Sequence, residues 1–373
     1  MKKLLTLLLT LTMVVSLFAG CGNGGDDDVI KFGSLGALSG DYAIYGMAVK
    51  NGAQLAIDEI NEAGGIDGKT VELVSYDSEG DPTKALQLFN RLVDQDGIKA
   101  LLGGTFSGES ITIGPEAEEK QLPMLSPTAT NAAVTPGLEY VYRACFIDPY
   151  QGRVAAKFAQ ENLGAKKAVI FRNVAQDYAV GLADNFAQAF TGEIVADEGY
   201  TDEDQDFKAI ITKIRDLEPD VIFIPDYSKM VGLIATQLRE EGIEAPLLGG
   251  DGWDGVQVDY AEVIEGNYFT NHYSTTDESP AVQDFISKYT EVYGEVPNAL
   301  AALAYDAAFI MAAAFEAAGS TEGPAVIAEL AKTGYTGVTG FTAFDADGNT
   351  AGKEAVIIKI VDGELTMETK MSD

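Results

Sequence analysis

The chain has 373 residues with 58 acidic and 25 basic side chains, so its formal net charge at pH 7 is −33. This acidity argues against nucleic acids and anionic membrane surfaces as partners, because both are polyanions. The length exceeds that at which a single hydrophobic core usually keeps growing, so we expect two domains.

The first 20 residues have the features of an export signal. Lysines at positions 2 and 3 precede the apolar run Leu4–Phe18, whose 15 residues are too few to span a bilayer comfortably but suit a signal-peptide core. Small residues then precede Cys21, and this arrangement resembles a bacterial lipobox, with Phe18 in place of the usual aliphatic residue. The resemblance implies cleavage before Cys21 and lipid attachment to its thiol. The alternative is an ordinary secretory signal followed by a chance cysteine.

Removal of residues 1–20 takes away two lysines and moves the net charge from −33 to −35. Residues 21–29 are rich in glycine and aspartate and would form a lipidated tether. With Cys21 lipidated, Cys145 is the one remaining cysteine, so no internal disulfide is possible.

From residue 30 onward, short apolar strands alternate with amphipathic helices. Gly64-Gly65 is expected to end the first of these helices, and Asp81-Pro82 supplies an N-cap and a first-turn proline for the next. The expected strands of this first set cover residues 30–35, 71–76, 100–102 and 123–125.

The same alternation restarts after Asp148-Pro149. Strands alternating with helices imply parallel sheets joined by right-handed crossovers, and two consecutive sets predict two similar α/β lobes. The expected strands of this second set cover residues 168–171, 193–196, 221–224 and 247–248.

The pattern changes near Thr275 to a helix followed by the Ala-rich segment Leu300–Ala318. That segment carries two acidic residues, so we expect a buried helix rather than a membrane span. Too few strands follow for a separate sheet, and this block should return to the first lobe. Residues 355–361 and 365–367 are expected to pair as a terminal hairpin, with Asp362-Gly363 as its turn.

These patterns predict a hinge of three chain crossings, near Ile147-Asp148, Thr275–Asp277 and Gly348–Lys353. The first lobe would then comprise residues 30–147 plus 277–347, and the second lobe residues 148–276 plus 348–373.

Ligands of open α/β sheets bind beyond the carboxyl ends of the strands, so the residues that follow each expected strand define a candidate site. In the first lobe these are hydroxyl side chains and backbone N–H groups at helix starts, which suit a carboxylate. In the second lobe they are aromatics and a carboxylate, which suit an ammonium. Each position alone also has a purely structural explanation. Ser107 and Thr130 could be helix caps, and Tyr178 and Tyr227 could be half-buried packing residues. Together they favour a zwitterion between the lobes, bound by Ser107, Thr128, Thr130, Tyr178, Tyr227 and Asp251.

Several ordered motifs resemble the leucine/isoleucine/valine-binding family of ABC-transporter solute receptors, and the resemblance extends from residue 30 to about residue 365. It implies the type I periplasmic-binding-protein fold, two α/β lobes joined by a three-crossing hinge. The matching motifs are Gly36-Ala37-Leu38-Ser39-Gly40, Ile44-Tyr45-Gly46, Asp58-Glu59-Ile60-Asn61, Gly64-Gly65-Ile66, Tyr76-Asp77, Asp81-Pro82, Ser126-Pro127-Thr128-Ala129-Thr130, and Tyr178 with Gly181.

The resemblance also implies roles for single residues. Tyr45 would wall the pocket for the ligand side chain, while Ser107 and Thr130 would hold the ligand carboxylate with backbone help around Thr128 and Ala129. Tyr178 and Tyr227 would close over the ligand from the second lobe. The role of ammonium partner falls to Asp251, at a position where the best-known members carry the longer glutamate.

One further departure from the family concerns a disulfide. Phe106 stands where those members place a cysteine that pairs with one near Gly80, so that disulfide cannot form here. The Phe106 ring would instead narrow the side-chain pocket. Tyr45, Phe106, Tyr178, Tyr227 and Trp253 together suggest that this pocket is apolar.

The implied function is that of an exported receptor, anchored by lipid to the outer face of the cell membrane. It would bind a neutral, branched-chain or apolar amino acid between closing lobes and deliver it to the permease and ATPase subunits of an importer, without cofactor or catalysis. The alternatives are a sensor domain, or a receptor for another small polar solute such as an amide or urea.

Enzymatic and metal-binding alternatives have weaker support. Gly250–Gly255 satisfies the dinucleotide pattern G-x-G-x-x-G, yet it places two carboxylates where a pyrophosphate would approach. His272 is the sole histidine, and without a G-x-S-x-G elbow we expect a surface or hinge residue rather than a catalytic base. Asp202, Asp204 and Asp206 alternate as in a calcium loop, but Phe207 replaces the required glycine.

Overall fold

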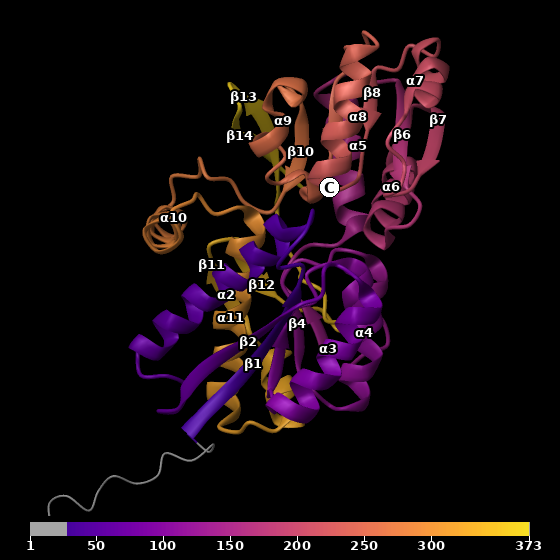
Figure 1. Ribbon diagram of the computed structural model, residues 1–373. Coiled ribbons are helices and arrows are strands. Elements are labelled where there is room, and N and C mark those ends of the chain that lie inside the picture. The colour runs from indigo at the N-terminus through magenta and orange to yellow at the C-terminus, as the bar shows by residue number, and fades with distance from the viewer. Residues whose placement is uncertain (1–27, 373) are drawn as a thin grey trace, which may run out of the picture.

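The computed structural model describes residues 28–372, which form two α/β lobes stacked one above the other in Figure 1. The first lobe, lower in the view, contains the indigo and purple N-terminal part of the fold and the gold segment near residues 300–340. The second lobe, above it, contains the magenta and orange middle of the chain. The expected signal peptide and Cys21 lie outside the described residues.

The sheet of the first lobe is parallel and has the strand order β2-β1-β3-β4-β5. The four expected strands are present, and the structure adds β5, which is not among the strands expected from the sequence. The strands are β1 (Val29–Gly36), β2 (Thr70–Asp77), β3 (Ala100–Leu102), β4 (Met124–Ser126) and β5 (Val141–Arg143).

Successive side chains of β1 point to opposite faces of this sheet, and each face is covered by helices. Phe32 packs against Phe315 of α11 with ring centroids 5.2 Å apart, whereas Leu35 belongs to the core on the opposite face. The face that carries Phe32 is covered by α2 (Ala43–Glu62), α11 (Ala299–Ala318) and α12 (Gly323–Leu330), and α10 (Pro280–Tyr293) packs against α2. The face that carries Leu35 is covered by α3 (Pro82–Arg91) and α4 (Ser107–Glu119).

The expected start and stop signals act as predicted. The Asp81 carboxylate accepts a hydrogen bond from the Lys84 N–H at 2.7 Å, and Pro82 occupies the first turn of α3. After α2, Gly64 and Gly65 have φ values of 115° and 73°, a region that L-residues with side chains rarely adopt. These caps set the ends of α2 and α3.

In the segment after residue 280, α11 packs along α2 of the first lobe. Among the described residues, α11 is the one helix long and apolar enough to cross a membrane by length and composition, and 83% of its apolar window is buried inside the fold. A small hairpin of β11 (Gly334–Gly337) and β12 (Gly340–Ala343) follows α12.

The second lobe has the strand order β14-β13-β10-β9-β8-β6-β7. The expected terminal hairpin forms at Asp362-Gly363. Its strand β13 pairs antiparallel with both β10 and β14, so this sheet is mixed rather than wholly parallel. The strands are β6 (Lys167–Asn173), β7 (Glu193–Tyr200), β8 (Val221–Phe223), β9 (Leu247–Gly249), β10 (Tyr268–Asn271), β13 (Ala355–Val361) and β14 (Glu364–Met371).

Helices cover both faces of this second sheet as well, with α5 and α6 in one core and α7, α8 and α9 in the other. Their bounds are α5 (Asp148–Glu161), α6 (Asp177–Ala189), α7 (Lys208–Arg215), α8 (Ser228–Glu240) and α9 (Gln257–Ile264). Residues 28–372 also contain three short helical segments, namely η3 (Leu92–Asp96), η4 (Ala132–Val134) and η5 (Asp251–Trp253).

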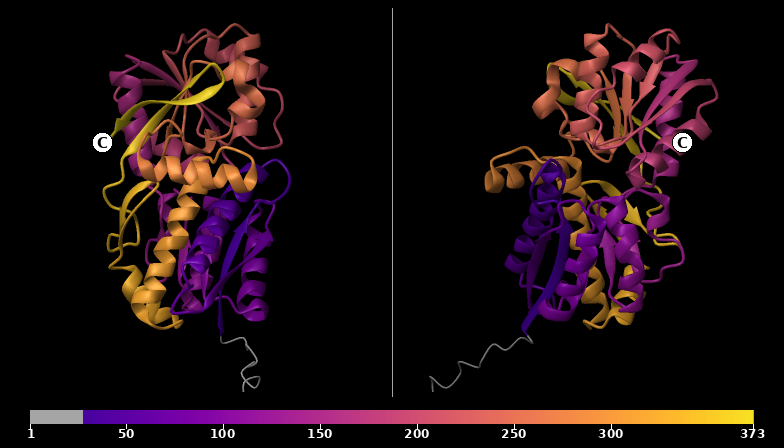
Figure 2. Two further views of the ribbon diagram at one scale, coloured as in Figure 1. Left: turned by 90° about the vertical axis from the view of Figure 1, so that its left-hand side faces the viewer. Right: turned by 45° about the vertical axis from the view of Figure 1, so that its right-hand side comes forward.

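The order of elements makes the chain pass between the lobes three times, after β5, after β10 and before β13. The left panel of Figure 2 shows the last passage, where the yellow C-terminal segment rises from the lower lobe into the upper sheet. There Lys353 is buried, and its Nζ donates to the Thr339 hydroxyl at 2.7 Å, which in turn donates to Asp306 at 2.6 Å. Burial lowers the pKa of Lys353 to about 8. This chain of contacts ties the third passage to α11.

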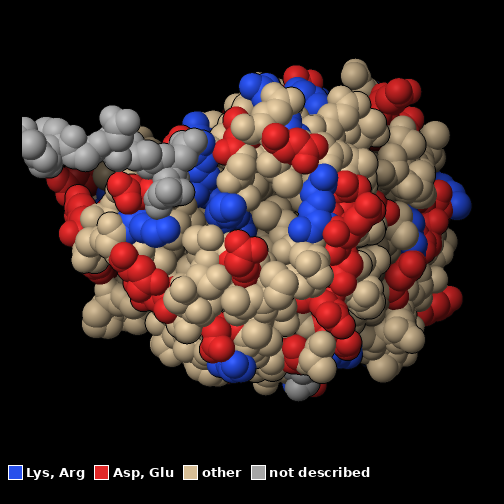
Figure 3. Space-filling model, turned by 90° about the horizontal axis from the view of Figure 1, so that it is seen from below, with Lys and Arg blue, Asp and Glu red and all other residues tan. Residues whose placement is uncertain are grey.

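The acidic composition is visible at the surface. The end of the molecule seen from below carries Asp and Glu side chains across the face, with Lys and Arg interspersed among them (Figure 3).

The contact between α2 and α11 generates a prediction about Gly52. A Cβ atom at Gly52 would lie 2.1 Å from the backbone oxygen of Ala301, so a substitution must push the two helices apart. We expect Gly52→Ala to lower the free energy of unfolding by about 1–3 kcal/mol in urea denaturation, despite the better helix propensity of alanine. Asp58→Ala, at an exposed position of the same helix, is the control and should change it by less than about 0.5 kcal/mol. Unchanged or increased stability of Gly52→Ala would contradict the close packing.

Candidate ligand-binding site

A cavity lies between the lobes at the carboxyl ends of the strands, where the space free of protein atoms is about 310 Å³ if the part open to solvent is included. Both lobes contribute to its wall, and six of the eight expected site residues line it. The lining residues are Tyr45, Thr105, Phe106, Ser107, Thr128 and Leu300 from the first lobe, and Tyr178, Tyr227, Asp251 and Gly252 from the second.

On the first-lobe side, the cavity borders the N-terminus of α4. Ser107 is the first residue of this helix, is buried, and accepts a hydrogen bond from the Asn131 N–H at 3.3 Å through its hydroxyl oxygen. The first N–H groups of a helix have no partner within the helix, and the helix dipole makes this end positive. The α4 terminus can therefore hold an anion without a cationic side chain.

The segment after β4 is already hydrogen-bonded within the protein. The Thr128 hydroxyl donates to the Thr105 carbonyl at 2.6 Å. Ala129 donates its N–H to the Ser126 hydroxyl at 3.2 Å and accepts from Arg143 at 2.9 Å. Both the N–H and the carbonyl of Ala129 therefore have hydrogen-bond partners within the protein, and Ala129 is outside the cavity lining.

Thr130, expected to help hold a carboxylate, is likewise buried but absent from the cavity lining. Its hydroxyl lies beside the Asp148 carboxylate without a well-aligned hydrogen bond between them. Burial raises the pKa of Asp148 to about 8, and the nearby charge of Asp251 acts in the same direction. Thr130 therefore contacts the first hinge crossing rather than the cavity.

Aromatic rings form most of the apolar wall. Tyr45, Phe106 and Tyr227 meet edge to face, with ring centroids 5.2–6.0 Å apart. Tyr178 stacks on Tyr227 at 5.2 Å. The Phe106 ring thus occupies the position expected of a residue that narrows the pocket.

Tyr45 also joins the two lobes directly. Its hydroxyl donates to the Gly252 carbonyl at 2.6 Å and accepts from the Ser228 N–H at 2.7 Å, and both partners belong to the second lobe. Further contacts cross the same gap, including Asn131 Nδ2 to the Asp177 carbonyl at 2.7 Å. The structure is therefore the closed form of the two lobes.

Asp251 is the carboxylate of the cavity wall, and three neutral side chains hold it. Its Oδ1 accepts from Gln151 Nε2 and from the Tyr178 hydroxyl, each at 2.9 Å, and its Oδ2 lies 3.1 Å from His272 Nε2. Burial, followed by the charge of Asp251, raises the pKa of Tyr178 well above its usual range, so the phenol remains a donor.

Asp251 does not act as a helix cap. The N-cap of η5 is Gly250, and no side chain caps this segment. Asp226, an acidic residue shortly after β8, is buried outside the cavity lining, where it accepts from the Tyr200 hydroxyl at 2.7 Å and the Tyr227 N–H at 2.7 Å.

Two sequence-based expectations need correction. His272 is 4% exposed and packs behind Asp251, so it is not a surface residue, although it does begin the second crossing. Trp253, expected to help form the pocket, is completely buried in the core, where its indole N–H donates to the Ile224 carbonyl at 2.7 Å.

Sequence reasoning also missed Gln151, Thr105 and Leu300. Gln151 and Leu300 lie in the first turns of α5 and α11, and Thr105 in the loop before α4. These residues could have been found by including every helix start at the edge where the two lobes meet, and not only the residues that directly follow a strand.

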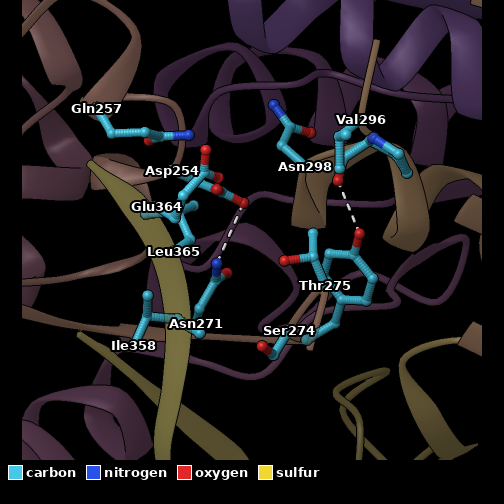
Figure 4. A pocket seen from close by; sticks show the side chains of 12 residues that line it. Asp254, Gln257, Asn271, Ser274, Thr275, Val296, Asn298, Ile358, Glu364 and Leu365 are labelled. Atoms are coloured by element: carbon cyan, nitrogen blue, oxygen red, sulfur yellow. Dashed lines mark hydrogen bonds between the residues drawn. The ribbon is translucent and has the colours of Figure 1, made fainter. Parts of the chain in front are cut away.

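The residues of the rejected motifs have structural roles. Within the G-x-G-x-x-G segment, Asp254 accepts from the Ala299 N–H of the first lobe at 2.6 Å and from Asn271 at 3.1 Å, beside a second cavity shown in Figure 4. Burial raises the pKa of Asp254 to about 6. Asp202 of the calcium-like segment accepts from the Tyr42 hydroxyl at 3.0 Å and from Asn173 at 2.7 Å.

Comparison with known proteins agrees with this architecture. Residues 29–364 match the family described as periplasmic binding protein. The chain is 35% identical over 336 residues to the Leu/Ile/Val-binding protein BraC3 of Rhizobium johnstonii, with 87% of this chain and 89% of that protein covered.

Solved structures give the same result. The branched-chain amino acid transporter substrate binding protein LivJ of Streptococcus pneumoniae, in complex with isoleucine, is 38% identical with a TM-score of 0.87, covering 92% of this chain and 99% of that one. The leucine binding protein LivK of Thermotoga maritima is 34% identical with a TM-score of 0.87 and the same coverage. The chain therefore belongs to the periplasmic binding protein family, a family of extracytoplasmic substrate-binding proteins rather than enzymes.

Proposed function

We propose that this protein is the receptor of an ABC importer and binds a neutral, branched-chain or otherwise apolar amino acid between its closing lobes. The observation that carries the proposal is the buried carboxylate of Asp251, which borders the cavity opposite the N-terminus of α4. One wall thus suits an ammonium group and the other a carboxylate. Relatives described as Leu/Ile/Val-binding support this ligand class.

The carboxylate end of the ligand would lie against Ser107 and the first N–H groups of α4. Tyr45 and Phe106 would contact the side chain of the ligand, together with Leu300 at the start of α11. These surfaces offer rings and methyl groups rather than charges, which favours an apolar side chain.

The ammonium end requires a countercharge, because closure of the lobes removes its water and an unpaired buried charge is costly. Asp251 provides that charge from the second lobe. In the described part of the chain, no lysine or arginine forms an ion pair with Asp251, so its negative charge is not neutralised by the protein.

Closure and binding would be coupled, since each lobe supplies half of the polar contacts and Tyr45 bonds across the gap. The lobe boundaries are proposed to lie at the three crossings, giving residues 30–147 plus 277–347 and residues 148–276 plus 348–373.

Asp251→Asn tests the ammonium contact. Removing one charge of a desolvated pair should lower the affinity for L-leucine, L-isoleucine or L-valine by roughly 30-fold to several thousandfold in calorimetry, corresponding to about 2–5 kcal/mol. The loss should be much smaller for 4-methylpentanoate, which resembles leucine without its amino group.

Two outcomes would contradict that assignment. If Asp251→Asn binds its amino acid within about threefold of the unaltered protein, another group holds the ammonium. If the unaltered protein binds an amino acid methyl ester as tightly as the free acid, the carboxylate contact at Ser107 is wrong.

Lipid attachment at Cys21 is the second part of the proposal. The chain enters the fold at Val29, at the end of β1 that lies farthest from the second lobe (Figure 1). A tether there would leave the cleft clear of the anchor.

Cys21→Ser tests this attachment. We expect an unprocessed or released protein, detected by intact-mass measurement and membrane fractionation, that still binds its ligand. Cys145→Ser, which alters the buried second cysteine, is the control and should leave membrane retention unchanged. Normal mass and retention of Cys21→Ser would show that the lipobox assignment is wrong.

A further inference from the structure

We infer that His272 is a positioning residue that aims the Asp251 carboxylate at the ligand ammonium and links it to the hinge. The inference rests on the proposed function and deepens it, because His272 is outside the cavity lining and would act through Asp251 alone.

The first observation is the place of His272 in the fold. It follows β10 at the second crossing, is 4% exposed, and its Nε2 lies 3.1 Å from Asp251 Oδ2. Its backbone is also fixed, because the His272 N–H donates to the Asn271 side chain at 2.8 Å. The ring is therefore held where the second crossing meets the ligand cavity.

The second observation concerns the proton on the ring. Asp251 accepts hydrogen bonds, so Nε2 must carry the hydrogen that faces it. Nδ1 is buried and has no hydrogen-bond partner among the described residues, so a second proton placed there would have no acceptor. Burial lowers the pKa of His272, and the charge of Lys353 from the third crossing acts in the same direction, opposed by Asp251. A neutral donor results, which orients Asp251 without neutralising it.

The third observation is the number of donors. An ionised carboxylate has about four acceptor positions, two on each oxygen. Gln151 and Tyr178 occupy both positions of Oδ1, and His272 occupies one of Oδ2. The position left for the ligand is therefore on Oδ2, the oxygen that His272 holds.

The fourth observation links this contact to the hinge. The His272 ring stacks on Phe146 with centroids 3.7 Å apart and planes 27° apart. Phe146 directly precedes the first crossing, and its ring also meets Tyr150 of α5 at 5.6 Å. His272 thus contacts Phe146 at the first crossing on one side and Asp251 on the other. A change in the hinge that moves Phe146 would therefore also move the ring that orients the Asp251 carboxylate.

His272→Leu and His272→Gln test the inference with L-leucine as the calorimetric probe. Leucine keeps an apolar contact with Phe146 but removes the donor, and we expect the affinity to fall about 10- to 100-fold, as for the loss of a hydrogen bond to a charged group. Glutamine places an amide nitrogen near the former Nε2 and should restore binding to within about fivefold. His272→Asn is equally polar but its amide nitrogen corresponds to Nδ1, so it should be as weak as His272→Leu.

A double-mutant cycle separates positioning from a general loss of structure. In the Asp251→Asn background, His272→Leu should weaken L-leucine binding by no more than about threefold further. Affinity for 4-methylpentanoate, which has no ammonium, should likewise change by less than about threefold in the single His272→Leu variant.

The outcomes distinguish this inference from the proposed function. If the unaltered protein binds L-leucine and His272→Leu binds equally well, or if the losses in the cycle are additive, the inference is overturned while the proposed function stands. A His272→Gln protein as weak as His272→Leu also overturns it. If the unaltered protein binds none of L-leucine, L-isoleucine and L-valine, the proposed function fails, and the inference fails with it.

Discussion

The carboxylate of Asp251 imposes the constraint on which the rest of the site depends, because it is a charge held in a cavity that closure largely removes from water. Such a charge is tolerated only where hydrogen bonds stabilise it. Gln151, Tyr178 and His272 provide those bonds, and all three are neutral donors. Neutral donors hold the carboxylate without pairing it to a protein cation, so a cationic ligand group could supply that pairing at the meeting point of the lobes.

The fold supplies these donors from segments that are distant in the sequence. Gln151 lies on α5 just after the first crossing, Tyr178 on α6, and His272 at the second crossing. Because parallel strands all end at the same edge of a sheet, the loops and helix starts of each lobe collect there. The start of α4, the proposed carboxylate site, belongs to the facing edge of the other lobe. Opposite charges of one small ligand can thus be recognised by opposite lobes, and a ligand that lacks either charge would engage only one of them.

Much of this arrangement could be predicted from the sequence. The alternation of strands and helices predicts two parallel α/β sets, and the residues that follow the strands include Ser107, Tyr178, Tyr227 and Asp251, which do line one cavity. The reason is that the end of each strand can be recognised from the local sequence. The topology of a parallel sheet then brings the carboxyl ends of its strands to one edge, where the residues that follow them lie close together. The helix start at Asp81 and the stop at Gly64-Gly65 are local in the same sense.

Other features depend on contacts between distant segments and could not be predicted in this way. His272 has no periodic pattern that places it in the core, since its burial depends on stacking with Phe146, which lies 126 residues earlier. Trp253 follows a strand like the site residues, yet its side chain turns into the core to reach the Ile224 carbonyl. Ala129 and Thr130 follow β4, but the buried Arg143 and Asp148 are their neighbours. Strand ends predict which loops form the site, whereas packing decides which side chains face the ligand.

Native mass spectrometry of the soluble chain, purified without denaturation and lacking the first 21 residues, tests the central claim most directly. The account predicts a one-to-one complex whose small molecule, once released, is a neutral amino acid with an apolar side chain. Recovery of a urea, an amide or a carboxylic acid without an amino group, bound in the same ratio and rebinding in competition with L-leucine, would contradict it.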